Sequence, residues 1–356
     1  MTPEELRARR LAGQRLAPRA DRPVAGVVRA LGAVQSQDLP GALLAVGQRS
    51  GATAAEVLAA LDRGEVLRTH VLRPTWHLVA PEDLRPYVAA TGVNVQRAAA
   101  PQLRRAGLDD ARLRRLHEVV ADRLRDGPAT RPELATALDA AGVAVDGVGL
   151  ANGIIHAESA AVLCSGPARE RTQTYALVED RTPPGPLPPR KAVLADLARR
   201  YLTTRGPATP ADFRWWSGLN AADARLAVDA VRDEFERSEE DGRELLWPPG
   251  EVHPAEGVLL LPNFDEYVVA YADRAELLEE RHRPLLDSRR NPIFQHVVVA
   301  AGAVVGTWSV AARARRLELT ARLFEAPSAG LTDALEAAAV ARYAAFRERE
   351  VVLVVT

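Results

Sequence analysis

The sequence predicts an α+β protein in which winged-helix units follow one another along the chain and a C-terminal α+β region comes last. Two segments, 127–142 and 206–219, support this prediction because both open with Gly-Pro, a threonine cap and an apolar helix face. Each segment follows an amphipathic helix and precedes a further helix. After the first segment, apolar stretches at 160–166 and 172–178 complete the order helix, helix, helix, hairpin, which is typical of a winged helix.

The repeated helices carry clear start signals. Thr130 with Glu133, and Thr209 with Asp212, have the spacing of capping boxes, in which a threonine hydroxyl and an acidic side chain satisfy each other's free backbone N–H groups. Asn220 is expected to cap the next helix of the second repeat. The sequence therefore predicts where these helices begin.

The first hundred residues repeat the pattern less regularly, and the end of the chain departs from it. A proline-rich stretch at 181–190 predicts a stiff linker. After Pro262 the pattern changes to strands, one helix at 328–346 and a last strand at 351–355. We expect helices near 3–13, 22–34, 53–63, 146–158 and 220–234, a hairpin over 65–79 that turns at Arg73-Pro74, and four parts at 1–105, 106–182, 183–262 and 263–356.

Composition bounds the class of protein. A chain of 356 residues with 47% hydrophobic content can bury large cores and predicts two to four domains. No apolar run approaches the roughly 20 residues of a membrane span, and the charged N-terminus lacks a signal-peptide core, so we expect a cytoplasmic protein without a membrane partner. Cys164 is the only cysteine, which excludes an intramolecular disulfide, and its neighbours indicate a buried strand end.

No sequence motif points to a metal or a cofactor. The chain contains no HExxH, no cysteine cluster, no P-loop and no dinucleotide glycine signature, so we expect neither a metal nor a nucleotide cofactor. Asp265 and Glu266 follow an apolar strand and a proline. Acids at a helix N-terminus are the favoured interpretation, and a carboxylate aimed into a cleft is the alternative. His70 and His77 alternate with apolar residues, which favours hydrogen-bonded structural histidines.

Six segments resemble the AlkZ-like family, the winged-helix DNA glycosylases related to the azinomycin-resistance enzyme. The resemblance implies three tandem winged helices in an open C-shaped arrangement and catalysis by a Gln-x-Gln motif. That motif here is Gln35-Ser36-Gln37, and Ser36 stands where the family usually has an apolar residue. The matching segments are ALGAVQSQD, LRTHVLRPTWHLV, ANGIIHAESAAVLCSG, GPATPADFRWWSGL, LLLPNFDEYVVAY and NPIFQHVVVAAGAVVGTW.

Two neutral amides suit this chemistry. Base excision passes through an oxocarbenium-like state, and an N7- or N3-alkylated purine already carries the positive charge that makes it leave without a general acid. Gln35 and Gln37 can hold one water because residues i and i+2 share a face in an extended segment. Asp38 can orient an amide or the water, although capping the next helix is the favoured role. His77 is a further candidate, and carbonyl capping by the two glutamines is the alternative.

The basic residues are almost all arginines, and Lys191 is the one lysine. Because strand cleavage by a glycosylase needs an amine to form a Schiff base, we predict a monofunctional enzyme. The formal net charge of −1 argues against a DNA partner unless the basic footprint is local. The candidate DNA contacts are Arg313, Arg315 and Arg316 on the turn of a C-terminal hairpin and, with weaker support, Arg73, Arg169 and Arg171 on the other hairpins.

The sequence thus predicts a monomeric DNA glycosylase for bulky alkylated purines in double-stranded DNA, with interstrand crosslinks as further candidate substrates, in repair or in self-resistance to a genotoxic natural product. Two alternatives remain open. One is a non-catalytic winged-helix DNA-binding protein or regulator. The other is an interaction protein, which the net charge favours.

Overall fold

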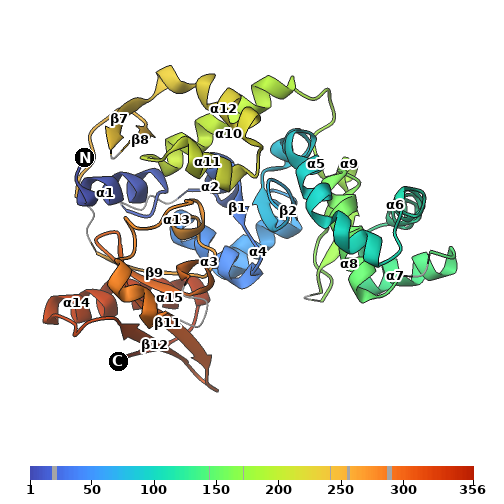
Figure 1. Cartoon of the computed structure of the whole chain (residues 1–356). Coiled ribbons are helices and arrows are strands. Elements are labelled where there is room, and N and C mark those ends of the chain that lie inside the picture. Colours follow the sequence, from blue (N-terminus) through green and yellow to red (C-terminus); the bar gives the residue numbers. More distant parts are fainter. Residues whose placement is uncertain (18–21, 144, 171, 241, 255–256, 287–290) are drawn as a thin grey trace.

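The computed structural model describes the chain except residues 18–21, 144, 171, 241, 255–256 and 287–290 (Figure 1). The first part contains a three-stranded antiparallel sheet in the order β1-β3-β2, with helices before and between its strands. Its elements are α1 (Pro3–Gly13), α2 (Val24–Leu31), β1 (Val34–Gln35), α3 (Leu39–Ser50), α4 (Ala54–Asp62), β2 (Leu67–His70) and β3 (Trp76–Val79).

The second part repeats this order of elements. Its strands pair in the order β4-β6-β5, so the first strand again lies beside the last strand of the hairpin. The long helix α5 (Pro81–Arg105) ends the first part. The second part consists of α6 (Asp110–Arg125), β4 (Ala129–Thr130), α7 (Arg131–Ala140), α8 (Gly147–Ser159), β5 (Leu163–Ser165), β6 (Thr174–Leu177) and α9 (Val178–Arg181).

The third part follows the proline-rich stretch and has the same order, with one bridge from Ala208 to Leu246 in place of the first strand. Its elements are α10 (Arg190–Arg205), α11 (Pro210–Ser217), α12 (Ala221–Asp229), β7 (Glu236–Glu240) and β8 (Arg243–Trp247). A 3-10 turn over Arg232–Glu234 lies between α12 and β7.

The C-terminal part is a five-stranded sheet in the order β13-β12-β11-β10-β9, in which only β12 and β13 run parallel. The helix expected over 328–346 contains a π-helical segment, Leu335–Val340. The elements are β9 (Val258–Leu261), α13 (Glu266–Val269), β10 (Val297–Ala300), β11 (Ala303–Ala312), β12 (Leu317–Leu323), α14 (Ala329–Ala334), α15 (Ala341–Arg347) and β13 (Val351–Val355), with 3-10 turns at Glu280–Leu285 and Pro292–Phe294.

The capping signals are confirmed. The Thr130 and Thr209 side chains each accept the backbone N–H of the acidic residue three positions on, and both boxes are reciprocal. Asn220 likewise accepts from the N–H of Asp223. Cys164 lies buried in β5, as expected, and burial raises its pKa to about 12.

Three features of the first part differ from the expectation. The helix expected over 22–34 ends at Leu31, because Gly32 takes a φ of +75° and turns the chain into β1. Helix α3 was not predicted; it is buried nearly all round, so its sequence has no amphipathic period. Helix α5 was not predicted either, because Pro86 and Pro101 interrupt its pattern.

The hydrophobic cores join parts that are distant in sequence. One core lies in the second part and is built from α6 to α8, the strands β4 to β6 and the end of α5. A second core packs α2, α3 and α4 against the C-terminal sheet, and a third joins the β2–β3 hairpin with α10 to α12 and α13. Figure 1 shows the C-terminal sheet and helices α6 to α8 at opposite ends of the molecule, with β1 between them. Among the described residues, no helix combines the length and apolar composition that crossing a membrane requires.

Candidate active site

Gln35 lies at the end of β1, where three segments meet. It pairs with His77 on β3, which in turn pairs with Thr69 on β2, so these three side chains project from the same face of the sheet. The Gln35 side chain is only 5% exposed, and its Oε1 accepts a 2.7 Å hydrogen bond from Arg73 Nη2. Its backbone N–H donates to Glu266 Oε1 over 2.8 Å. Gln35 is therefore held at both its backbone and its amide.

Ser36 is completely buried between the two glutamines. Its backbone N–H donates to Trp76 O (2.7 Å), and its carbonyl accepts from Arg68 Nη2 (2.8 Å). The Ser36 Oγ also lies 3.3 Å from Arg68 Nε. The departure from the family's apolar residue is thus matched by a polar partner that reaches the hydroxyl.

Gln37 and Asp38 complete the turn into α3. Gln37 is exposed and makes no hydrogen bond with another residue of the described part of the chain. Asp38 occupies the N-cap position of α3, but its side chain makes no capping bond, so the expected capping role is wrong. Its Oδ2 and Asn263 Oδ1 both crowd Gly41, where an added Cβ would lie 2.9 Å and 2.8 Å from them. The Asp38 carboxylate is directed to the side of α3 that faces Asn263.

Glu266 holds the backbone of Gln35 through a hydrogen bond, a role that the sequence did not predict. It is fully buried, and its Oε2 accepts from Arg205 Nη2 (2.6 Å) and from Trp216 Nε1 (2.9 Å). Arg205 is equally buried and also donates to the carbonyl of Ala33, two residues before Gln35. Because its charge is balanced by Arg205, Glu266 fixes the backbone of β1 and is not available as a base.

Asp265 has the predicted role at a helix N-terminus and also an ion pair that was not predicted. It is the N-cap of α13 and accepts from the N–H of Tyr267, as an acid at a helix N-terminus should. It also forms a buried two-pronged ion pair with Arg49, at 2.7 Å and 2.9 Å. The signal that could have revealed the Asp265–Arg49 pair was the arginine near the end of the largely apolar helix α3.

Two strained backbone positions lie beside the site. Leu72 precedes Arg73 with a φ of +65°, and Phe264 precedes Asp265 with a φ of +59°. Residues other than glycine rarely adopt a positive φ, which costs about 1–3 kcal/mol. Such strained positions are common at functional sites. Gly218, at the end of α11, packs on the Leu72 carbonyl so closely that an added Cβ would lie 2.3 Å away. The turn that carries Arg73 is thus clamped.

The two histidines of this hairpin differ. His70 is buried and hydrogen-bonded to Glu158, which confirms a structural role. His77 donates from Nδ1 to the carbonyl of Thr75 (2.9 Å), while its buried Nε2 has no partner among the described residues. Burial, followed by the charge of Arg73, holds the His77 pKa well below 6.5. His77 is therefore neutral at pH 7, with a free acceptor at Nε2.

Of the candidate DNA-contacting arginines in the described part of the chain, one is turned into the site and the others are exposed. Arg73 was expected on an exposed hairpin tip, but its guanidinium is turned inward onto Gln35. Arg313, Arg315 and Arg316 are exposed at the turn between β11 and β12, where Arg313 pairs with Glu318. Arg169 is exposed and pairs with Glu133, and Arg171 lies outside the described residues.

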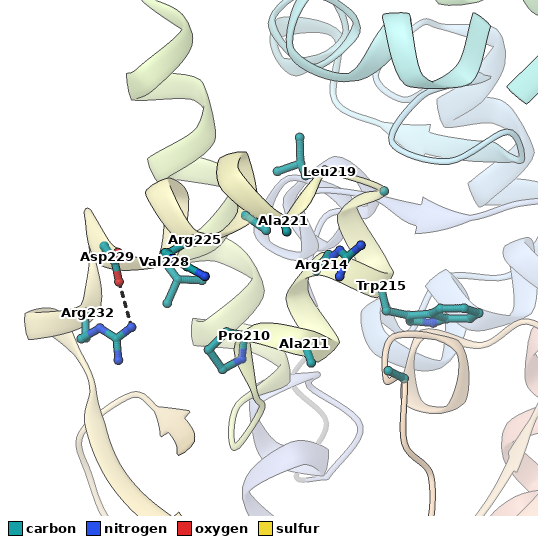
Figure 2. A pocket seen from close by; sticks show the side chains of 13 residues that line it. Pro210, Ala211, Arg214, Trp215, Leu219, Ala221, Arg225, Val228, Asp229 and Arg232 are labelled. Carbon is teal, nitrogen blue, oxygen red and sulfur yellow. Dashed lines mark hydrogen bonds and ion pairs between the residues drawn. The ribbon is translucent and has the colours of Figure 1, made fainter. Parts of the chain in front are cut away.

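A groove of about 870 Å³ runs between α11 and α12 (Figure 2). Trp215 lies at one end of it, 43% exposed, with its indole N–H donating to Val269 O (2.9 Å). The guanidinium carbons of Arg73 and Arg274 lie 5.8 Å and 5.5 Å from the centre of the Trp215 ring. The end of the groove at Trp215 therefore lies close to Arg73, the residue that donates to the Gln35 amide. Within the described residues, no group of three or more histidine, cysteine or acidic side chains could hold a metal ion.

The fold of mixed helices and sheets agrees with what comparison with known proteins shows. A family model described as DNA glycosylase AlkZ-like matches residues 28–346, and the chain belongs to this family of DNA glycosylases, which are hydrolases of N-glycosyl bonds. The chain is 28% identical over 319 residues to the interstrand DNA cross-link repair glycosylase of Streptomyces sahachiroi, covering 85% of this chain and 86% of that protein. The solved structure of Streptomyces sahachiroi DNA glycosylase AlkZ shares the fold, with a TM-score of 0.81 at 24% identity, covering 99% of this chain and all of the other.

Proposed function

We propose that this glycosylase releases bulky N7- or N3-alkylated purines from double-stranded DNA, interstrand crosslinks included, and that Gln35 and Gln37 carry the reaction. The relative from Streptomyces sahachiroi is described as a cross-link repair glycosylase, which supports the substrate class. The observation that carries the proposal is electrostatic. The carboxylate in contact with Gln35, that of Glu266, is neutralised by buried Arg205, so two uncharged amides remain to do the chemistry.

The reaction needs little more than positioning. A purine alkylated at N7 or N3 leaves as a neutral base once the glycosidic bond stretches, so no proton donor is required. The exposed amide of Gln37 holds the attacking water, and Gln35 fixes it from the inner side. Asp38 orients this water or the Gln37 amide, and neutral His77 offers its free Nε2 acceptor to the same face of the sheet.

The architecture supports a DNA duplex as the partner. We propose that 1–105, 106–182 and 183–262 act as three tandem winged helices around the DNA and that 263–356 contributes the basic hairpin. The strand orders β1-β3-β2 and β4-β6-β5, with the Ala208–Leu246 bridge, support this assignment. A single copy holds the duplex, with Arg315 and Arg316 in a groove and the second hairpin, including Arg169 and Arg171, at the phosphates.

The reaction stops at the abasic site. A Schiff base needs a lysine at the sugar, and the one lysine, Lys191, is exposed in the first turn of α10. Strand scission by the purified protein without heat or base would contradict this.

The test uses duplexes that carry one N7-alkylguanine, followed by alkaline cleavage of abasic sites. We expect wild type to release the base and both Gln35→Ala and Gln37→Ala to lose activity, each by roughly 10²-fold, as when one positioning group is removed. Gln102→Ala, at an exposed glutamine on α5, is the matched control and should be unchanged. Full activity in both active-site variants would eliminate the proposed pair.

A further inference from the structure

We propose that Arg73 and Arg274 form a binding site for a phosphodiester group of the lesion-bearing strand, and that its occupation frees the Gln35 amide for catalysis. This inference rests on the proposed function. It adds a site and a step to it, because the phosphate and Gln35 compete for the same guanidinium.

The first argument is that both arginines are buried in large part without an ion pair to a described carboxylate. Arg274 donates from Nε to Val268 O (2.8 Å) and from Nη1 to Ala272 O (3.2 Å), and its buried Nη2 has no partner in the described part of the chain. Arg73 donates from Nη2 to Gln35, and its buried Nε is likewise without a described partner. Buried donors without acceptors are rare and costly, which points to a missing anion.

The second argument is that the nearby carboxylates are already engaged. Glu266 holds Arg205, and Asp212 accepts from the backbone N–H groups of Thr209, the N-cap of α11, and of Ala272. Asp273 pairs with Arg243. The acids around the two arginines therefore contribute attraction at a distance but no direct contact.

The third argument is mutual repulsion. Arg73 and Arg274 approach the same Trp215 indole. Burial, followed by the charge of Arg73, lowers the Arg274 pKa to about 10. An anion between two such guanidiniums relieves both the repulsion and the unmet donors. Phosphate oxygens, which accept charge-assisted bonds in pairs from arginine, fit this need.

The fourth argument is access for a strand. Trp215 is 43% exposed and forms one end of the groove between α11 and α12, which exposed Arg214 and Arg225 also line (Figure 2). Neither of these arginines forms an ion pair with a described residue. A DNA backbone that follows this groove brings one phosphate to Arg73 and Arg274, and the sugar beside it to Gln35.

The consequence concerns the Gln35 carbonyl. In the free protein its Oε1 accepts from Arg73, so that bond occupies a lone pair that would otherwise hold the water, and the adjacent positive charge opposes an oxocarbenium ion. A phosphate that takes over Arg73 frees this oxygen and places a negative charge beside the sugar. The site is completed only when the strand is bound.

The test replaces one phosphate at a time around an N7-alkylguanine by a neutral methylphosphonate and measures single-turnover excision. We expect one position to slow wild type roughly 10- to 100-fold, the range of a lost charged hydrogen bond. The same substitution should cost Arg274→Gln less than about twofold, because the partner is already gone. Arg274→Lys, which keeps the charge, should recover part of the wild-type sensitivity. Arg115→Gln changes an exposed arginine on α6 and should behave as wild type.

Two outcomes overturn the inference: no methylphosphonate position that affects wild type, or an Arg274→Gln variant, shown to be folded by its melting temperature, that is as sensitive as wild type. Duplex binding keeps the test independent of catalysis, since Arg274→Gln should lower the slope of log affinity against log salt by about one. If wild type does not excise the lesion but Arg274→Gln still lowers the salt slope, only the catalytic proposal fails. Stabilisation by inorganic phosphate with no methylphosphonate effect would assign the site to free phosphate and refute the DNA role.

Discussion

The substitution Glu266→Gln tests whether the buried ion pair beneath Gln35 holds the site. The change keeps the size of the side chain and removes its charge. Glu266 accepts four N–H contacts: one from Gln35, two from Arg205 and one from Trp216. An amide placed there turns an NH2 group toward at least one of these donors and leaves the Arg205 guanidinium, which is fully buried, without a counter-charge.

The expected cost is large because neither partner can reach water. Breaking a buried ion pair by removing one charge destabilises a protein by about 3–5 kcal/mol, and for a chain of this length that corresponds to a fall in melting temperature of roughly 4–7 °C. Excision should fall as well, because the backbone N–H of Gln35 loses the carboxylate that sets its position. Both effects have one cause.

Denaturant unfolding and single-turnover excision on the same preparations measure the two effects. Glu318→Gln is the matched control, since it removes the same charge from a solvent-exposed pair with Arg313, where solvent screens the interaction. We expect the control to change stability far less than Glu266→Gln. Equal changes in the two variants, or a loss at Glu266 of less than about 1 kcal/mol, would refute the argument that this pair is a buried support.

Three further predictions concern the same site. Gln37→Ala should lower excision by roughly 10²-fold while leaving the free energy of unfolding within about 0.5 kcal/mol of wild type. Gln35→Ala should also destabilise by about 1–3 kcal/mol because Arg73 loses its acceptor, and equal stability losses in the two variants would contradict this. Gly218→Ala should destabilise by more than about 1 kcal/mol in thermal unfolding, since φ is +65° and the new Cβ would lie 2.3 Å from a carbonyl oxygen; an unchanged melting temperature would contradict the clamp. Because the folded pKa of His77 is depressed, protons bind the unfolded chain first, and stability should fall as pH drops below 6.5. His77→Asn should reduce that slope by up to about 1.4 kcal/mol per pH unit, and an unchanged slope would show that His77 does not contribute.

Local signals in the sequence were sufficient for much of the fold. The Thr130 and Thr209 capping boxes act between residues three apart, so they form wherever the helix forms, and both are present. The prediction of an extended segment is confirmed for Gln35, which lies in β1 because Gly32 ends the preceding helix. The strand ends at Gln35, and Gln37 lies in the turn that follows. Helix α3 escaped prediction because burial on all sides removes the periodicity on which such predictions depend.

The sequence by itself determined the family, the neutral amide pair, the near-absence of lysine and the helices that begin with a cap. Only the tertiary structure decided what surrounds the pair. Glu266 meets the backbone of Gln35 across 231 positions of sequence, and Arg73 turns inward because Leu72 adopts a left-handed conformation against Gly218. Such contacts depend on how sheets and helices pack, and a buried charge takes whichever partner packing brings within hydrogen-bonding distance, which no local pattern encodes.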